Sequence, residues 1–172
     1  MIQEQVKPRN SAIKNAVVKI GFFALGRGCE SASGFDKQLQ NELTAWPQGY
    51  IIMLKVAPNG QELWLKKHNT GLKWIPKQQK QADLIVLFKN LETAFQIITT
   101  QNNVHTAFAQ NRIMVYGDVA QSMVLIRVLN IVQAYLFPPF LSKNVLKRVP
   151  KFSLKEHLGR ARVYTLGLAL GK

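Results

Sequence analysis

The chain has 172 residues, 47% of them hydrophobic, and its 23 Lys and Arg against 9 Asp and Glu give a formal net charge of +14. This length predicts one domain, and this apolar fraction allows a real hydrophobic core. The single cysteine, Cys29, excludes an intramolecular disulfide and fits a reducing cytoplasm. The sequence shows no secretory signal and no run of roughly 18 uninterrupted apolar residues. By these patterns we expect neither a secreted protein nor one that spans a membrane. We expect a cytoplasmic protein that can lie against the inner face of the membrane.

The first quarter of the chain is predicted to be helical. Apolar residues recur at helical spacing over residues 12–25 and again over residues 35–46, where Pro47 ends the pattern. Between them, residues 26–34 (GRGCESASG) are rich in Gly and Ser and are predicted to break the helix.

The pattern then becomes typical of β-strands, with alternation over residues 61–68 and a near-continuous apolar run over residues 82–88. Four strands are predicted, over residues 49–56, 61–68, 72–78 and 82–88. The turn between the first two contains Asn59-Gly60, which we expect to supply positive-φ residues. Because the connections are short, we expect an antiparallel meander.

Helical spacing returns over residues 90–101, with Asn90 as the expected N-cap, and a short helix follows over residues 104–110. Asn111 can adopt the left-handed conformation of a turn before a last strand at 112–117.

A long helix should run from its N-cap Asp118 to about Phe137, where Pro138 stops it. On a helical wheel, one continuous apolar arc is interrupted only by Gln121. It comprises Val124, Leu125, Val128, Ile131, Val132, Tyr135 and Leu136. The arc indicates either a fully buried core helix or one wall of a cavity for an apolar ligand, and periodicity leaves both interpretations open.

The C-terminal tail carries eight basic residues from Lys143 onward against one acid, Glu156. Ser153 and Glu156 have the spacing of a capping box, so an amphipathic helix is expected to begin there.

The order of these elements resembles that of the sterol carrier protein type 2 family, from about Tyr50 to Phe137. The resemblance is carried by ADLIVLFKNLETAFQIITTQ and HTAFAQNRIMVYGDVAQSMVLIRVL. Their matching positions are Ala82-Asp83 at a strand start, Ala107-Phe108 before a turn, Arg112 leading a strand, Gly117-Asp118 ending it, and Met123 on the following helix. Gln110-Asn111 stands where the family commonly has Gly, a mild departure.

The resemblance implies an α+β fold, in which a mixed, largely antiparallel five-stranded sheet and helices on one face enclose an apolar tunnel. It implies a lipid-binding domain at 35–141, preceded by a basic helical extension at 1–34 and followed by a basic amphipathic helical tail at 142–172. The ligand would be a fatty acyl, phospholipid, or isoprenoid- or sterol-like lipid, and small bacterial members of the family include factors that handle isoprenoid quinone intermediates.

We expect the ligand to contact side chains of the last strands and helices. These are Phe88, Phe95, Ile98, Phe108, Val124, Leu125, Val128, Ile131, Val132 and Tyr135. A polar replacement of Val128 or Val132 should then reduce ligand retention more than stability, whereas equal loss of both would indicate plain core.

The positive charge predicts docking to an anionic membrane, at about 1 kcal/mol per Lys or Arg near the surface. The expected docking residues of the tail are Lys143, Lys147, Arg148, Lys151 and Arg160, and a second basic group surrounds the middle strands at Lys66, Lys67, Lys73, Lys77 and Lys80. A merely solvated face is the alternative. Nucleic acid stacked on Trp64 and Trp74 is not expected, because the charge is mostly Lys and no nucleic-acid motif is present.

Catalysis is not expected, and neither is a metal or a cofactor. His68, His105 and His157 lack metal-site spacing, Cys29 has no placed base, and Asp118 is explained as an N-cap. The alternative to a lipid carrier is an assembly or scaffold subunit whose core is filled, docked on a partner enzyme or on a second copy.

Overall fold

The computed structural model describes residues 11–75, 81–99, 101–102 and 104–136. In chain order its elements are α1 (Ser11–Ser33), α2 (Lys37–Leu43), β1 (Ile51–Val56), β2 (Glu62–His68), β3 (Gly71–Ile75), β4 (Leu84–Phe88), α3 (Leu91–Ile98), α4 (Val104–Ala109), β5 (Ile113–Tyr116) and α5 (Val119–Leu136). The predicted fold class, α+β with a mixed five-stranded sheet and helices against it, is confirmed. The predicted tail helix lies outside the described residues.

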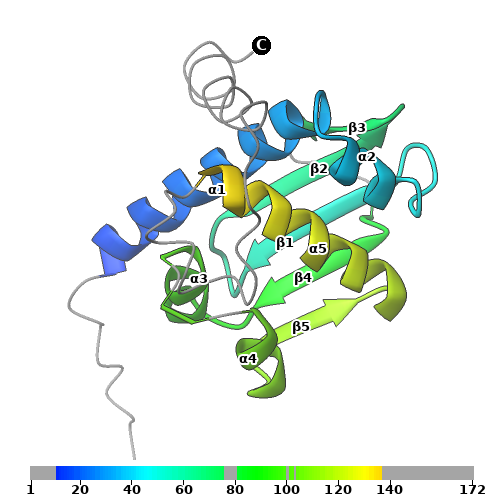
Figure 1. The fold of residues 1–172 in the computed structure, drawn as a ribbon. Coiled ribbons are helices and arrows are strands. Elements are labelled where there is room, and N and C mark those ends of the chain that lie inside the picture. The colour runs from blue at the N-terminus through cyan, green and yellow to red at the C-terminus, as the bar shows by residue number, and fades with distance from the viewer. Residues whose placement is uncertain (1–10, 76–80, 100, 103, 137–172) are drawn as a thin grey trace, which may run out of the picture.

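The strands are ordered β3-β2-β1-β4-β5 (Figure 1). Three neighbouring pairs are antiparallel, but β1 and β4 are parallel, so the predicted simple meander is wrong at β4. Burial explains the difference, because β4 is apolar enough to occupy an interior position between β1 and β5, where Leu54 lies opposite Val86 and both are buried. Asp83 fixes the start of this pair, since its carboxylate accepts a hydrogen bond from the Ile51 N–H at 2.8 Å.

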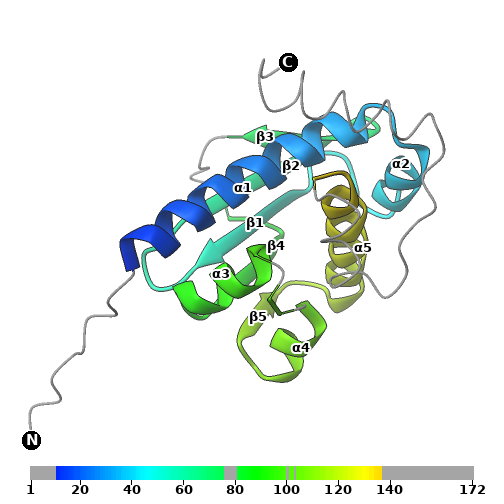
Figure 2. The same ribbon diagram turned by 60° about the vertical axis from the view of Figure 1, so that its left-hand side comes forward.

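Helices α1, α3 and α5 cover one face of the sheet (Figures 1 and 2). Period-two alternation sends every second strand residue toward these helices, and together they make the main hydrophobic core. A smaller cluster, built around Met53, Trp64 and Ala82, forms separately. Helix α1 lies in the predicted N-terminal extension, yet its Val18, Phe22 and Cys29 belong to the main core.

Helix α1 continues through the glycine-rich stretch 26–34 as far as Ser33, so the predicted break there is wrong. The glycines are needed for close packing instead of for a turn. A Cβ added at Gly26 would come within 2.9 Å of Leu63, and one at Gly28 within 2.9 Å of Val132. Their missing side chains therefore let α1 pack closely against β2 on one side and α5 on the other.

The predicted helix caps at Asn90 and Asp118 are confirmed. Asn90 accepts a hydrogen bond from the Thr93 N–H at 2.8 Å, and the Asp118 carboxylate accepts one from the Ala120 N–H at 2.6 Å. Asn111 has the expected positive φ, of 56°.

The expectation for Asn59-Gly60 is wrong, because the positive-φ residues in the described part of the chain are Asn69, Asn111, Gly49 and Gly117. The reason is loop length. Residues 57–61 separate β1 from β2, so a two-residue turn with positive φ is not required there.

Candidate functional site

A cavity of about 280 Å³ lies between the sheet and helices α1, α3, α4 and α5. All of its described lining residues are apolar except His105, Ser122 and Gln133. The cavity exists because these helices cover the sheet without filling the space above β4 and β5. Its volume is near the lower end of the roughly 300–1,000 Å³ typical of small-molecule sites.

The floor of the cavity is formed by β1, β4 and β5. Leu54, Val86 and Val115 lie side by side across the three strands, and Phe88 pairs with Ile113 one step further along. Because alternate residues of a strand share one face, this row of apolar side chains follows directly from the strand register.

One face of α5 forms the longest wall. The lining residues Val119, Ser122, Met123, Leu125, Ile126, Leu129 and Gln133 recur at helical spacing. From Val119 to Gln133 the helix rises 14 residues, which at 1.5 Å per residue is about 21 Å. The cavity is therefore elongated along α5.

From the exposure of the lining residues, we infer that the mouth of the cavity lies between α4 and the first turn of α5. There Phe108, Val119 and Met123 line the cavity and are also 53%, 69% and 46% exposed. Large apolar side chains at such exposure are unusual in a group, and they continue the apolar lining out to the protein surface. Gly117 holds the chain here at a φ of 122°, where a Cβ would lie 2.7 Å from the Asp83 carbonyl oxygen.

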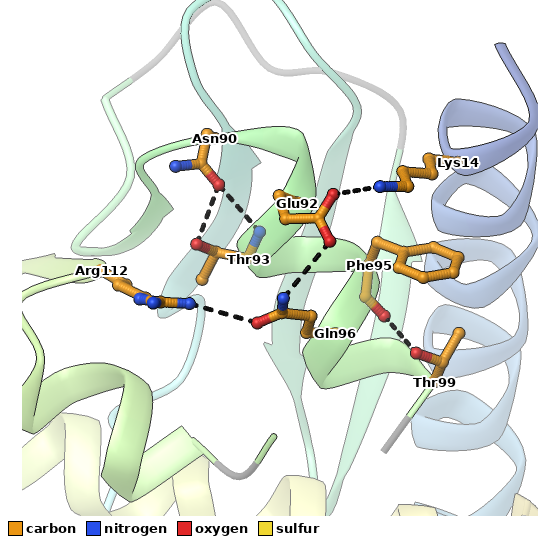
Figure 3. A network of polar contacts seen from close by, with 8 residues as sticks. All are labelled: Lys14, Asn90, Glu92, Thr93, Phe95, Gln96, Thr99 and Arg112. Carbon is orange, nitrogen blue, oxygen red and sulfur yellow. Dashed lines mark hydrogen bonds and ion pairs between the residues drawn. The ribbon is translucent and has the colours of Figure 1, made fainter. Parts of the chain in front are cut away.

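Polar contacts hold α3 in place as another wall (Figure 3). Lys14 of α1 forms an ion pair with Glu92, and the Gln96 amide donates to the same carboxylate at 3.3 Å. From the other side of α3, Arg112 donates to Gln96 at 3.2 Å, which ties this helix to the start of β5 (Figure 3). The hydrogen bond from Lys14 lowers the pKa of Glu92 below its ordinary value.

Four of the ten predicted ligand-contacting residues line the cavity, namely Phe88, Ile98, Phe108 and Leu125. Val124, Val128, Val132 and Tyr135 are buried but are not among its lining residues, and Ile131 and Phe95 are half-buried outside it.

Apart from Leu125, the most continuous apolar arc of α5 packs against its neighbouring helices instead of facing the cavity. Val132 contacts the backbone of α1 at Gly28, and the Tyr135 ring lies edge-on to Phe35. The Tyr135 hydroxyl also donates to Asp36 at 2.6 Å, which joins α5 to the N-cap of α2. This arc is core, and the cavity takes the neighbouring face.

Sequence reasoning missed most of the cavity lining on α1, the strands and α5. The missed residues of α5 are Val119, Ser122, Met123, Ile126, Leu129 and Gln133. A signal for them was present, because Met123 and Ile126 extend the apolar surface of the helix beyond the main arc.

Helix α5 is, within the described residues, the one helix long and apolar enough to cross a membrane. Half of it is buried inside the protein, against α1, α2 and the cavity, as expected for a core helix.

The described side chains of the cavity offer little chemistry beyond apolar contact. Cys29 lies in the core with no exposed surface, and burial raises its pKa to about 12, so it remains an inert thiol at neutral pH. No group of three or more His, Cys, Asp and Glu that could hold a metal ion occurs among the residues described.

The basic surface is only partly within the described residues. Lys66 and Lys73 are exposed and lie opposite each other on β2 and β3. Lys67 does not belong to this surface, because it is 3% exposed and its ammonium donates to the Asn69 carbonyl; burial lowers its pKa. The expected docking residues Lys143, Lys147, Arg148, Lys151 and Arg160 lie outside the described residues, as do Lys77 and Lys80.

The two tryptophans considered as stacking platforms for bases are both engaged in the protein. Trp64 is buried, and Trp74 contacts the Phe23 ring and the Arg27 guanidinium. The alternative of nucleic acid stacked on these indoles therefore has no exposed platform at Trp64.

The sequence matches no family model and no curated protein. Several solved structures resemble the chain at low identity. A UbiJ-SCP2 ubiquinone synthesis protein is 12% identical, over 78% of this chain and 99% of that one, with a TM-score of 0.47. The sterol carrier protein domain 2 of Helicoverpa armigera is 18% identical, over 75% and 94%, with a TM-score of 0.44.

Sterol carrier protein 2 of Yarrowia lipolytica, in its apo form, is also 18% identical, over 77% and 98%, with a TM-score of 0.44. All three neighbours are named as sterol carrier proteins or domains.

Proposed function

We propose that the protein is a non-enzymatic carrier that binds a hydrophobic ligand in this cavity. The observation that carries the proposal is an elongated apolar cavity whose lining continues to the surface through Phe108, Val119 and Met123. Each buried CH₂ is worth about 0.8 kcal/mol, so a long acyl chain gains on the order of 10 kcal/mol by leaving water. Binding of this kind needs dry volume and an opening, and no catalytic group.

The shape of the cavity favours a single linear chain over a bulky ligand. Its lining follows α5 for about 21 Å of helix rise, which is comparable to an extended chain of roughly 17 carbon–carbon bonds at about 1.2 Å per bond. Its volume of about 280 Å³ is small for a fused-ring sterol or for both tails of a phospholipid. Within the lipids considered, we therefore favour a fatty acyl or isoprenoid chain.

A filled interior is the premise of the alternative function, an assembly or scaffold subunit. The cavity of about 280 Å³ is space that the described side chains leave unfilled. An interior with room for a ligand supports the carrier over the scaffold.

We further propose that the protein loads and unloads at an anionic membrane, as a peripheral protein on the cytoplasmic side. The outer face of α1 supports this, because Ile13, Ile20 and Phe23 are 67%, 66% and 40% exposed, with the exposed Lys19 beside them. An apolar stripe with lysines suits the interface of an anionic bilayer.

Native mass spectrometry of the purified protein tests the carrier proposal directly. We expect discrete added masses that disappear on denaturation, and identification of the released species should show a lipid with one long chain. A Leu129→Trp variant should fold and lose these masses, because the indole fills the cavity. Ala120→Trp is the matched control, since Ala120 is exposed on the same helix outside the cavity and should keep them. Equal retention by both variants would place the lipid elsewhere.

A further inference from the structure

One polar side chain stands out in the lining of the cavity. Gln133 of α5 is only 6% exposed and faces the cavity, and its side-chain amide has no hydrogen-bond partner among the described residues. The other two polar lining residues are accounted for. The Ser122 hydroxyl donates to the Val119 carbonyl at 2.6 Å, and His105 is exposed.

Gln133 lies far from the mouth of the cavity. The mouth is at Val119, and Gln133 follows it 14 residues later on the same helix face, about 21 Å away along the axis. Apolar residues, among them Ile126 and Leu129, line the wall between these two points. The cavity therefore combines a long apolar wall with one amide at its inner end.

A buried amide without a partner destabilises a protein, whereas an apolar residue of similar size at the same place would not. A leucine would suit a site that binds only hydrocarbon. The glutamine is explained if the ligand itself supplies the hydrogen-bond partner.

We propose that Gln133 binds a neutral polar group, a hydroxyl or a carbonyl, at the end of the ligand that enters the cavity first. The amide offers both N–H donors and a carbonyl acceptor, so it can pair with either group. No Lys, Arg, Asp or Glu occurs among the described lining residues, so an ionised carboxylate or phosphate would be buried there without a counter-charge. An ionised head group stays at the mouth, in water.

This inference rests on the proposed carrier function and narrows its ligand class to lipids with an uncharged polar group at the inserted end. It is tested with three probes of equal chain length, dodecane, dodecan-1-ol and dodecanoate at pH 8. Dissociation constants are measured for the full chain and for Gln133→Leu. We expect dodecan-1-ol to bind about fivefold more weakly to the variant, because its hydroxyl loses the amide. Dodecane should bind as well or better, and dodecanoate, with its carboxylate at the mouth, should be unchanged.

Gln121→Leu is the matched control. Gln121 lies on the same helix, its side-chain oxygen is also buried without a partner, and it does not line the cavity. This variant should bind all three probes like the wild type. A spectroscopic readout adds independent evidence. The infrared stretch of dodecan-2-one, labelled with ¹³C at its carbonyl, should lie lower in the wild type than in Gln133→Leu, since the amide hydrogen-bonds the bound carbonyl.

The outcomes separate the two proposals. Equal binding of dodecan-1-ol to wild type and Gln133→Leu, with no change in the carbonyl band, would overturn the role of Gln133 and leave the carrier standing. Equal weakening of all three probes by Gln133→Leu would also overturn it, because the residue would then be structural. Binding of none of the probes to either protein would overturn the carrier proposal as well.

Discussion

Glu92 joins three parts of the structure through one carboxylate. It pairs with Lys14 on α1 and accepts from Gln96, which in turn holds Arg112 at the start of β5 (Figure 3). The side chains are partly open to water, 30% for Lys14 and 47% for Glu92, so solvent weakens the pair. The main effect of this ion pair is therefore to position α3, and with it Ile97 and Ile98, against the cavity.

The pH dependence of the free energy of unfolding should reveal the contribution of the Lys14–Glu92 ion pair. Because the folded-state pKa of Glu92 is lowered, its contribution is present above the unfolded-state pKa and is lost as pH falls through the folded-state pKa. We expect Glu92→Gln to reduce the free energy of unfolding by less than about 1 kcal/mol at pH 7. The difference should vanish in acid, where the wild-type carboxyl is protonated too. Urea unfolding at pH 7 and in acid measures this, and in a Lys14→Met background the pH-dependent difference should be smaller, because only Gln96 and Arg112 still lower the pKa of Glu92.

Helix α5 shows at the level of one element why the site was harder to predict than the fold. Its position, its N-cap Asp118 and its apolar arc follow from the sequence, and the structure confirms the N-cap. Which face meets a cavity depends on where α1 and α2 lie, and periodicity carries no information on that. The same limit applies to α1, where Gly26 and Gly28 indicate a break locally but allow close packing in three dimensions.

The strands also show which features follow from the sequence and which depend on tertiary packing. Each was placed from its β-like pattern or composition to within a few residues, and the caps at Asn90 and Asp118 and the turn at Asn111 were predicted correctly. The parallel pairing of β1 with β4 could not be predicted from connection length alone, because it depends on which strand partner buries β4 best.

Substitutions on the two faces of α5 should have opposite effects. Val128 has no exposed surface and lies outside the cavity lining, so Val128→Thr should lower the free energy of unfolding by about 1–3 kcal/mol and leave ligand affinity unchanged. Ile126 is half-buried in the cavity lining, so Ile126→Thr should weaken ligand binding with less effect on stability. Chemical denaturation and ligand titration of both variants give the comparison. Loss of affinity in Val128→Thr at full stability would restore the original expectation for Val128 and Val132.

At the scale of the whole molecule, net charge and exposed apolar surface act together. The chain carries +14, and the outer face of α1 and the mouth of the cavity both expose large apolar side chains. In the proposed docking, charge would attract the protein to an anionic bilayer from a distance set by ionic strength, and apolar side chains would then insert at contact. A carrier needs contact of this reversible kind in order to exchange its ligand.

Vesicle flotation tests this picture. We expect the protein to float with phosphatidylserine-containing vesicles at low salt, and to float less at 300 mM salt or with neutral phosphatidylcholine vesicles. Ile20→Ser should reduce the bound fraction about tenfold, since an exposed isoleucine no longer enters the bilayer. Val119→Ser, at the equally exposed mouth, is the comparison. Loss of flotation in Val119→Ser and not in Ile20→Ser would move the docking surface from α1 to the mouth.

The cavity also bears on how the protein responds to hydrostatic pressure. Unfolding eliminates internal void space, so a ligand-free protein with a void of about 280 Å³ should have a large negative volume change of unfolding. A lipid that occupies the void removes most of that volume difference. The loaded protein should therefore resist compression that unfolds the unloaded one, even if both melt at similar temperatures.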